Sequence, residues 1–207
     1  AGAGLKNTVI LTVAEGDDGE IYAGSDGDGI YVIGSDDTVE RIGRDEGLTS
    51  DVVMRIKKDD VTGVYWIVTS NSIEYMKNGV IKQVESFPYN NNYDLYFDND
   101  HNMWILSSYG VYMVATDEML DDNVTDYALY TIANGLTDTP TANSYSAMGD
   151  DGNLYIPGRD GVCMVNINHM LEGRIRVKTA VNSIYSGEDK IVPDENGVYT
   201  IPKTRGR

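Results

Sequence analysis

The chain has 207 residues, 16 of them basic and 33 acidic, and a formal net charge of −17. This length suits one domain, or one domain and part of another. A surface of this charge repels nucleic acid and anionic lipid, because binding to either depends on clusters of Lys and Arg. We therefore expect no nucleic-acid partner. The acidity is explained either by solubility or by attraction for cations or basic partners.

Neither a membrane span nor a disulfide is expected within the chain. The sequence has no run of 18 apolar residues, which a spanning helix would need. Cys163 is the single cysteine and lies in an apolar run, so we predict that it is a small buried residue. The chain does not begin with Met and has no recognisable signal peptide, so we expect a processed or excised piece of a longer protein.

Short β-strands are predicted along the chain, beginning with four runs in which apolar and polar residues alternate. These first strands cover residues 9–14, 52–57, 93–97 and 143–148. Each is followed by a turn rich in Asp, Gly or Asn, and then by a strand that contains the recurring aromatic residue of the repeat: Tyr22, Trp66, Trp104 or Tyr155. Such turns between β-branched and aromatic runs are typical of hairpins.

The same strand series continues in every unit. Third strands follow, for example at residues 30–33 and 111–114, and fourth strands are expected at 38–42, 81–84 and 127–132. The aromatic residues recur at a period of about 40–50 residues, which indicates a β-propeller. We predict an all-β fold with about four blades, as part of a larger propeller or as a closed ring. The expected blades cover residues 8–51, 52–92, 93–140 and 141–174.

Other repeated segments support this register. Gly-Leu-Thr at residues 47–49 returns at 135–137, each time before a predicted first strand. Residues 116–121 and 168–172 are predicted to form single helical turns. The fixed positions of the two tryptophans place them in the core between blades rather than in a ligand site.

The pattern changes at residue 175. Alternating apolar residues predict strands at 175–181 and 198–201, with Pro193 and Gly197 between them. Two or three strands cannot bury a sheet face alone. Residues 175–207 are therefore predicted to be the truncated start of a β-sandwich.

The repeated motif D-x-x-G-x-[WY]-[IV]-G-[ST], followed by G-[IL]-Y, resembles the two-component regulator propeller repeat. Its first copy is Asp17–Ser25 with Gly29–Tyr31, and four copies cover roughly residues 8–174. The tail, with its Ile-Arg-Val strand and Tyr199-Thr200-Ile201-Pro202, resembles the Tyr-rich β-sandwich module that follows such propellers. The sequence departs from the pattern at Ser72, His101 and Pro157.

This resemblance implies an extracytoplasmic region, periplasmic or at the cell surface, of a bacterial membrane signalling protein. Such propellers are usually followed by the sandwich, a transmembrane helix and an output module, such as a histidine kinase or a diguanylate cyclase. Many members of the family respond to oligosaccharides. The implied partners are a small polar ligand, for example an oligosaccharide, and a second copy of the chain in a homodimer. Membrane contact would come only through segments outside this chain.

No catalytic residue, metal site or cofactor is predicted in this region. Residues 98–102 place oxygen atoms at alternate positions as a calcium loop does, but they lack its turn glycine and distal Glu. A hairpin turn explains the same residues. His101 and His169, the two histidines, fall in different blades, and the chain has no G-x-S-x-G elbow.

The ligand prediction depends on the loops at one face of the propeller. Tyr rings, Asn amides and Arg guanidinium groups suit the flat surfaces and hydroxyl groups of sugars. The candidate ligand-binding residues in these loops are Asn91, Asn92, Tyr109, Asn143, Tyr145 and Arg159. The alternative is that these residues only form turns and pack between blades.

Other functions remain open at this stage. A streptogramin-lyase-like or other metal-dependent propeller enzyme would use similar blades, although the scarcity of His argues against the lyase. A secreted lectin-like binder would recognise sugar without an output module. A scaffold propeller would bind protein and no small ligand.

Overall fold

The computed structural model describes residues 4–7, 9–142, 144–169 and 183–201. The chain divides into two compact units, Ala1–Met170 and Leu171–Arg207. Short antiparallel strands make up nearly all the regular structure of both units. Among the described residues, no helix has the length and apolar content that crossing a bilayer requires.

Four antiparallel sheets form the first unit, and the strands of each are neighbours in chain order. Blade 1 contains β1 (Ile10–Glu15), β2 (Ile21–Ser25), β3 (Ile30–Ile33) and β4 (Val39–Ile42). Blade 2 contains β5 (Val53–Asp59), β6 (Val64–Thr69), β7 (Ile73–Lys77) and β8 (Val80–Gln83). Blade 3 contains β9 (Asn92–Phe97), β10 (Asn102–Ser107), β11 (Val111–Ala115) and β12 (Ala128–Tyr130). Blade 4 contains β13 (Ala147–Met148), β14 (Asn153–Pro157) and β15 (Val162–Asn166).

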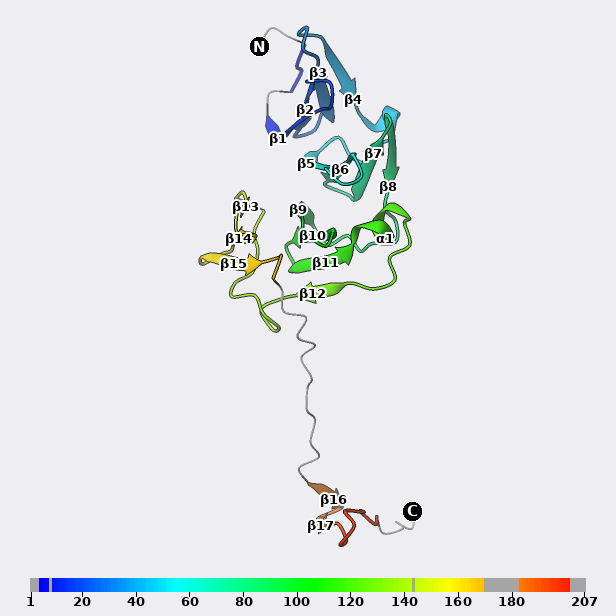
Figure 1. Cartoon of the computed structure of the whole chain (residues 1–207), viewed down its shortest axis with the longest axis vertical. Helices are drawn as coiled ribbons and strands as arrows, with labels where there is room; N and C mark the ends of the chain where they lie inside the picture. Colours follow the sequence, from blue (N-terminus) through cyan, green and yellow to red (C-terminus); the bar gives the residue numbers. More distant parts are fainter. Residues whose placement is uncertain (1–3, 8, 143, 170–182, 202–207) are drawn as a thin grey trace. The chain divides into compact units, whose positions relative to one another are not determined.

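The sheets are arranged around a common centre, with the first strand of each nearest to it (Figure 1). This is the arrangement of a β-propeller, so the predicted fold class is confirmed. The small amount of helix is also as expected. The helical turn predicted at 116–121 is α1 (Thr116–Leu120), and a 3₁₀ turn, η1 (Arg44–Glu46), precedes the first Gly-Leu-Thr motif.

The hydrophobic core consists of three layers, one between each pair of successive blades. Ile30 and Ile67 belong to the layer between blades 1 and 2. Trp66 packs with Met103 and its neighbours between blades 2 and 3. Trp104 packs between blades 3 and 4, in the layer that contains the buried Cys163. Both tryptophans are fully buried, which confirms their predicted role in the core.

The Gly-Leu-Thr motif connects one blade to the next. The leucine of each copy is buried in the core. Leu48 lies in the layer between blades 1 and 2, and Leu136 lies in the layer between blades 3 and 4. In the first copy, the backbone N–H of Thr49 donates to Glu74 Oε1 at 3.0 Å, and the Thr49 hydroxyl donates to the same oxygen. Ser72, which replaces a glycine of the repeat, donates to it at 2.7 Å. These bonds satisfy Oε1 of the fully buried Glu74 carboxylate, whereas Oε2 has no hydrogen bond among the described residues.

Turn geometry explains why one glycine of the repeat can be replaced. Gly19, Gly63 and Gly152 occupy the first hairpin turn of blades 1, 2 and 4, with φ between 70° and 80°. His101 occupies this turn in blade 3 with φ of 62°. The left-handed conformation costs a non-glycine residue roughly 1–2 kcal/mol. Contacts of the His101 side chain, described below, offset that cost.

The outer face of blade 4 exposes apolar side chains. Tyr155 holds the position of Trp66 and Trp104 in the repeat, yet it is 40% exposed. Val162 and Met164, on the neighbouring strand, are also exposed. Each aromatic residue of this series faces the following blade, and no following blade exists among the described residues.

Two strand predictions are wrong. The first strand of blade 4, predicted at 143–148, is limited to β13 at Ala147–Met148 within residues 144–148; Tyr145 lies outside this strand, and its hydroxyl donates to Leu11 O of β1. Residues 198–201 form no strand: Asp194 accepts from Gly197 in a tight turn, and the described part of the second unit has only a hairpin of β16 (Ile184–Ser186) and β17 (Asp189–Ile191). The strand predicted at 175–181 lies outside the described residues, so the sandwich stays a prediction.

Candidate ligand-binding site

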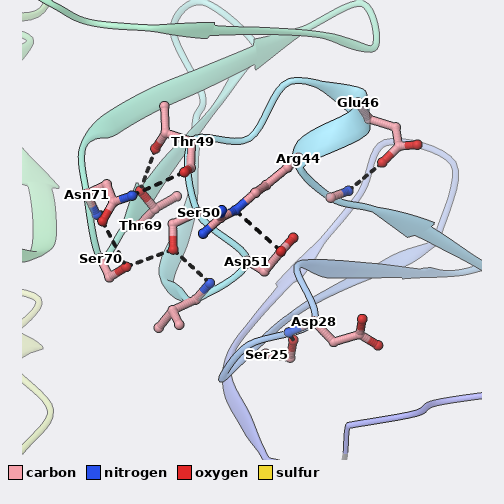
Figure 2. Close-up of polar contacts among 12 residues, drawn as sticks. Ser25, Asp28, Arg44, Glu46, Thr49, Ser50, Asp51, Thr69, Ser70 and Asn71 are labelled. Atoms are coloured by element: carbon pink, nitrogen blue, oxygen red, sulfur yellow. Dashed lines mark hydrogen bonds and ion pairs between the residues drawn. The ribbon is translucent and has the colours of Figure 1, made fainter.

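Loops of successive blades converge on one face of the propeller, which we call the loop face. It contains the connections between blades and the turns between the second and third strands. The backbone N–H of Gly27 donates to Asp51 O at 3.1 Å, and that of Asp160 donates to Asp138 Oδ2 at 2.7 Å. Figure 2 shows the equivalent contacts of blade 2, where Asn71 donates to Thr49 O and Ser50 bonds to Ser70. The loops therefore hold one another in place.

The predicted site residues divide between the loop face and the centre of the propeller. Tyr109 is 62% exposed on the turn between β10 and β11, and Arg159 is exposed on the turn between β14 and β15. Asn91 is exposed in the connection before β9 and accepts from Ser108 N at 3.4 Å. Tyr145 instead reaches the centre of the propeller.

The two remaining predicted residues have different positions. Asn92 is 1% exposed, and its amide donates to Pro88 O at 3.3 Å. The Asn92 Oδ1 atom is buried without a hydrogen bond among the described residues. Asn143 lies outside the described residues.

In the acidic turn at 98–102, both carboxylate oxygens of Asp98 accept hydrogen bonds from the protein itself. Asp98 Oδ1 accepts from the backbone N–H of Asp100 at 3.0 Å and of Asn102 at 2.8 Å. Asp98 Oδ2 accepts from the indole of Trp104 at 2.9 Å. These contacts show how the turn is built.

The two histidines have separate partners. His101 Nε2 lies 2.9 Å from Asp59 Oδ2 of blade 2, and its ring stacks on Phe97. His169 Nδ1 lies 3.1 Å from Asn166 Oδ1. Among the described residues, no group of three or more His, Cys, Asp or Glu side chains is placed to hold a metal ion.

A large cleft lies at the centre of the propeller, between the first strands of blades 1 and 2. It has a volume of about 890 Å³ and runs along β1, with Arg55, Lys57 and Tyr145 on its other walls. This volume lies within the range of about 300–1,000 Å³ that is usual for small-ligand sites. A smaller hollow of about 200 Å³, lined by Tyr93, Arg55 and Tyr145, adjoins it. The Tyr145 hydroxyl donates to Leu11 O at 2.5 Å and so fixes the ring between the two cavities.

A cluster of charged and aromatic residues forms one wall of the cleft. Asp94 Oδ1 lies 2.9 Å from Arg55 Nε and 3.2 Å from Lys57 Nζ. The Arg55 guanidinium lies 4.6 Å from the centre of the Tyr145 ring, and Lys57 Nζ lies 3.0 Å from that of Tyr96. Attraction between a cation and an aromatic face contributes about 0.5–2 kcal/mol. The cluster is thus held by both kinds of contact.

Burial shapes the electrostatics of this wall. Asp94 is 1% exposed, whereas the side chains of Arg55 and Lys57 are 14% and 25% exposed and reach the cleft. Burial lowers the pKa of Lys57 to about 8, although the nearby Asp94 opposes the shift. Burial also raises the pKa of Tyr93 and of Tyr96 above the usual range, so both hydroxyls keep their protons at neutral pH. The wall presents two cations to the cleft above one buried carboxylate.

The sequence analysis missed Arg55, Lys57 and Asp94, although a signal was present. Arg55 pairs with Val68 and Asp94 with Leu106, so the two occupy equivalent positions on the first strands of blades 2 and 3. Lys57 and Tyr96 are equivalent in the same way, because they pair with the two tryptophans. First strands meet at the centre of a propeller. An alignment of the four repeats would therefore have brought these charges together.

Comparison with known proteins gives a likeness in fold alone. Neither a family model nor a curated protein matches the sequence. A solved structure assigned as the extracellular domain of a hybrid two-component system from B. thetaiotaomicron matches 93% of this chain, with a TM-score of 0.70 and 16% identity. A second such domain from the same organism matches 82%, with a TM-score of 0.58 and 15% identity. The chain spans 27% and 21% of those two chains.

Propeller enzymes are also similar in fold. A gluconolactonase from Xanthomonas campestris matches 74% of this chain and is covered over 57% of its own length, with a TM-score of 0.57 and 14% identity. The likeness to the extracellular domains of two-component systems agrees with the resemblance seen in the repeats. At these identities it establishes the propeller fold and leaves the function to the site.

Proposed function

We propose that this chain is a ligand-sensing part of the extracytoplasmic region of a bacterial membrane signalling protein. A small polar ligand, such as an oligosaccharide, would bind in the central cleft. The observation that carries the proposal is this cleft, with its volume of about 890 Å³ and its wall of Arg55, Lys57 and Tyr145. The fold shared with extracellular domains of hybrid two-component systems supports the sensing role.

The walls of the cleft suit a sugar-like ligand. Tyr145 is 67% exposed and offers a flat ring that Leu11 and Arg55 hold in position. Arg55 and Lys57 provide several N–H donors for hydroxyl or carboxylate groups. A wall held in place before binding reduces the entropy cost of association.

Isothermal titration calorimetry with a panel of oligosaccharides from polysaccharide breakdown tests this proposal. We expect at least one to bind, and we expect Tyr145→Ala to weaken its binding about tenfold. Tyr185→Ala, at a position that is also well exposed but lies in the second unit, is the matched control. Absence of binding across the panel would contradict the proposed function. Loss of binding with Tyr109→Ala but not with Tyr145→Ala would move the site to the loop face.

Transmission of the signal forms part of the same proposal. Ligand binding would change how two copies of the chain associate, and segments outside this chain would carry the change through the membrane to a kinase or cyclase. The ligand can shift such an equilibrium only by the difference in its affinity for the two states. Sedimentation velocity with and without a binding oligosaccharide would measure that shift in association.

Enzyme activity is the second candidate function, favoured by the fold likeness to a virginiamycin B lyase from Staphylococcus aureus, with a TM-score of 0.52 and 15% identity. A propeller lyase or lactonase would turn over its substrate and release a product. Product analysis after incubation with streptogramin B and with gluconolactone distinguishes the two functions. Turnover that tracks the purified chain would contradict a purely sensory role.

A further inference from the structure

A buried hydroxyl without a partner belongs to Tyr93, one of the residues that line the smaller hollow beside the cleft. The Tyr93 side chain is 3% exposed, and its hydroxyl has no hydrogen bond among the described residues. Arg55 Nε, at the same hollow, is also buried without a hydrogen bond of good geometry, although it lies 2.9 Å from Asp94. Leaving such a group unpaired costs about 1–3 kcal/mol. The unpaired Tyr93 hydroxyl, beside the Arg55–Asp94 ion pair at one hollow, indicates that a polar group from outside completes the site.

The local charge indicates which kind of group this is. Arg55 and Lys57 together carry two positive charges, and Asp94 beneath them carries one negative charge. The cluster therefore has an excess of one positive charge, in a chain whose formal net charge is −17. This excess is local to the wall formed by Arg55 and Lys57, because the cleft is also lined by Glu15, Asp17 and Asp60. The nearest other cation of the cleft, Lys58, is already paired with Asp17.

We propose that the ligand of the cleft carries a carboxylate, as an acidic sugar does, and that Arg55, Lys57 and the hydroxyl of Tyr93 bind it. This inference rests on the proposed function and names the ligand class of that same site.

Each of the three residues has a distinct role in this recognition. The terminal nitrogens of an Arg guanidinium form a planar fork that matches the two oxygens of a carboxylate. The Lys57 ammonium adds a second positive charge from the wall of the larger cavity. Burial raises the pKa of the Tyr93 hydroxyl, which therefore keeps its proton and donates a hydrogen bond to the carboxylate. One anion thus satisfies the excess charge and the unpaired donor together.

The test compares two disaccharides that differ only at one end. Calorimetry is performed on the whole chain with a disaccharide that ends in glucuronate, and with its counterpart that ends in glucose. We expect the acidic sugar to bind about ten- to hundredfold more tightly, as charge-assisted hydrogen bonds would give. Tyr93→Phe should remove a large part of this preference. Because Tyr93→Phe deletes only an unpaired hydroxyl, it should leave the melting temperature unchanged or slightly raised.

Further variants separate the roles. Arg55→Gln should abolish the preference for the acidic sugar, and Lys82→Gln, which removes an exposed Lys on β8, should not. Equal affinity for both sugars, unaffected by Tyr93→Phe, would overturn the carboxylate inference while the proposed function survived. Binding of neither sugar nor any other oligosaccharide would overturn both. Inorganic phosphate that binds as tightly as the acidic sugar would overturn the assignment to a carboxylate, since the site would then accept any small anion.

The pH dependence of binding gives an independent readout. Three groups face the Lys57 ammonium: Asp94, Arg55 and the ring of Tyr96. The pKa of Lys57 is lowered to about 8, while that of Tyr96 is raised above the usual range, so Lys57 is the member that loses charge between pH 7 and 9.5. Affinity for the acidic sugar should fall about tenfold over this interval, and affinity for the neutral sugar should stay constant. Lys57→Gln should abolish the pH dependence; a fall that persists in this variant would contradict the role of Lys57.

Discussion

Replacing Asp94 with Ala should destabilise the propeller strongly. The Asp94 carboxylate is 1% exposed and lies 2.9 Å from Arg55 Nε and 3.2 Å from Lys57 Nζ. It also accepts from the backbone N–H of Leu95 at 2.9 Å and from the Tyr96 hydroxyl at 3.2 Å. Without it, two largely buried cations would repel one another with no counter-charge.

The magnitude follows from the burial of the pair. Removing one partner of a buried ion pair costs about 3–5 kcal/mol, because the remaining charge stays uncompensated. In a unit of this size each kcal/mol lowers the melting temperature by about 2–4 °C, so the expected fall is about 6–20 °C. Scanning calorimetry would measure the fall in temperature, and urea unfolding would measure the free energy.

A second substitution separates charge repulsion from lost packing. Adding Lys57→Met to Asp94→Ala removes one of the two repelling cations and keeps the length of the side chain. We expect the double variant to recover part of the lost stability. A loss below about 1 kcal/mol in Asp94→Ala, within the ordinary range of point mutations, would refute the reasoning. So would a double variant that is less stable than Asp94→Ala alone.

Three further predictions concern contacts between blades. His101→Ala should lower the free energy of unfolding in urea by about 1–3 kcal/mol, because it removes a partner of the buried Asp59. The control variant His169→Ala should lower it by less than about 0.5 kcal/mol, and equal effects of the two variants would contradict the prediction. Burial tends to raise the pKa of Asp59, but hydrogen bonds from its neighbours outweigh burial and lower this pKa below its ordinary value of 3.8. The ionised Asp59 should therefore stabilise the fold fully above pH 3.8, the ordinary value, and this stabilisation should disappear as the pH falls through the lower pKa of the folded state. Thermal unfolding between pH 5 and pH 2.5 should show this loss of stability as a fall in melting temperature. The fall should be smaller in His101→Ala than in the unsubstituted chain. Trp104→Ala should cost about 3–5 kcal/mol and Tyr155→Ala, at the equivalent exposed position, about 1 kcal/mol; the reverse order would refute the packing of blades.

The fold was predictable because its signals are repeated. The aromatic residue of the second strand returns in every blade, and a following blade buries Trp66 and Trp104 fully and Tyr22 in part. The first strand of blade 4 was not predictable. The apolar pattern near Tyr145 is typical of a strand, but this residue lies outside β13, and its hydroxyl donates to Leu11 O, far away in sequence.

The candidate site was predictable only in part. Tyr145, which lines the central cleft, was among the predicted residues because a Tyr in a connecting loop is a plausible ligand contact. Arg55, Lys57 and Asp94 were missed because a single charge within a strand does not show which residue it pairs with until the neighbouring blade is placed beside it. Arg55 and Asp94 occupy the same position of the repeat in successive blades. Equivalent positions come into contact only because the first strands of the two blades meet at the centre of the propeller.

A crystal structure of the chain with a glucuronate-containing disaccharide would test the central claim most directly. We predict that the sugar occupies the central cleft, with Tyr145 against its ring and Arg55 within hydrogen-bond distance of its polar groups. A sugar bound only over the loop face, at Tyr109 and Arg159, would contradict the claim that the central cleft is the sensing site.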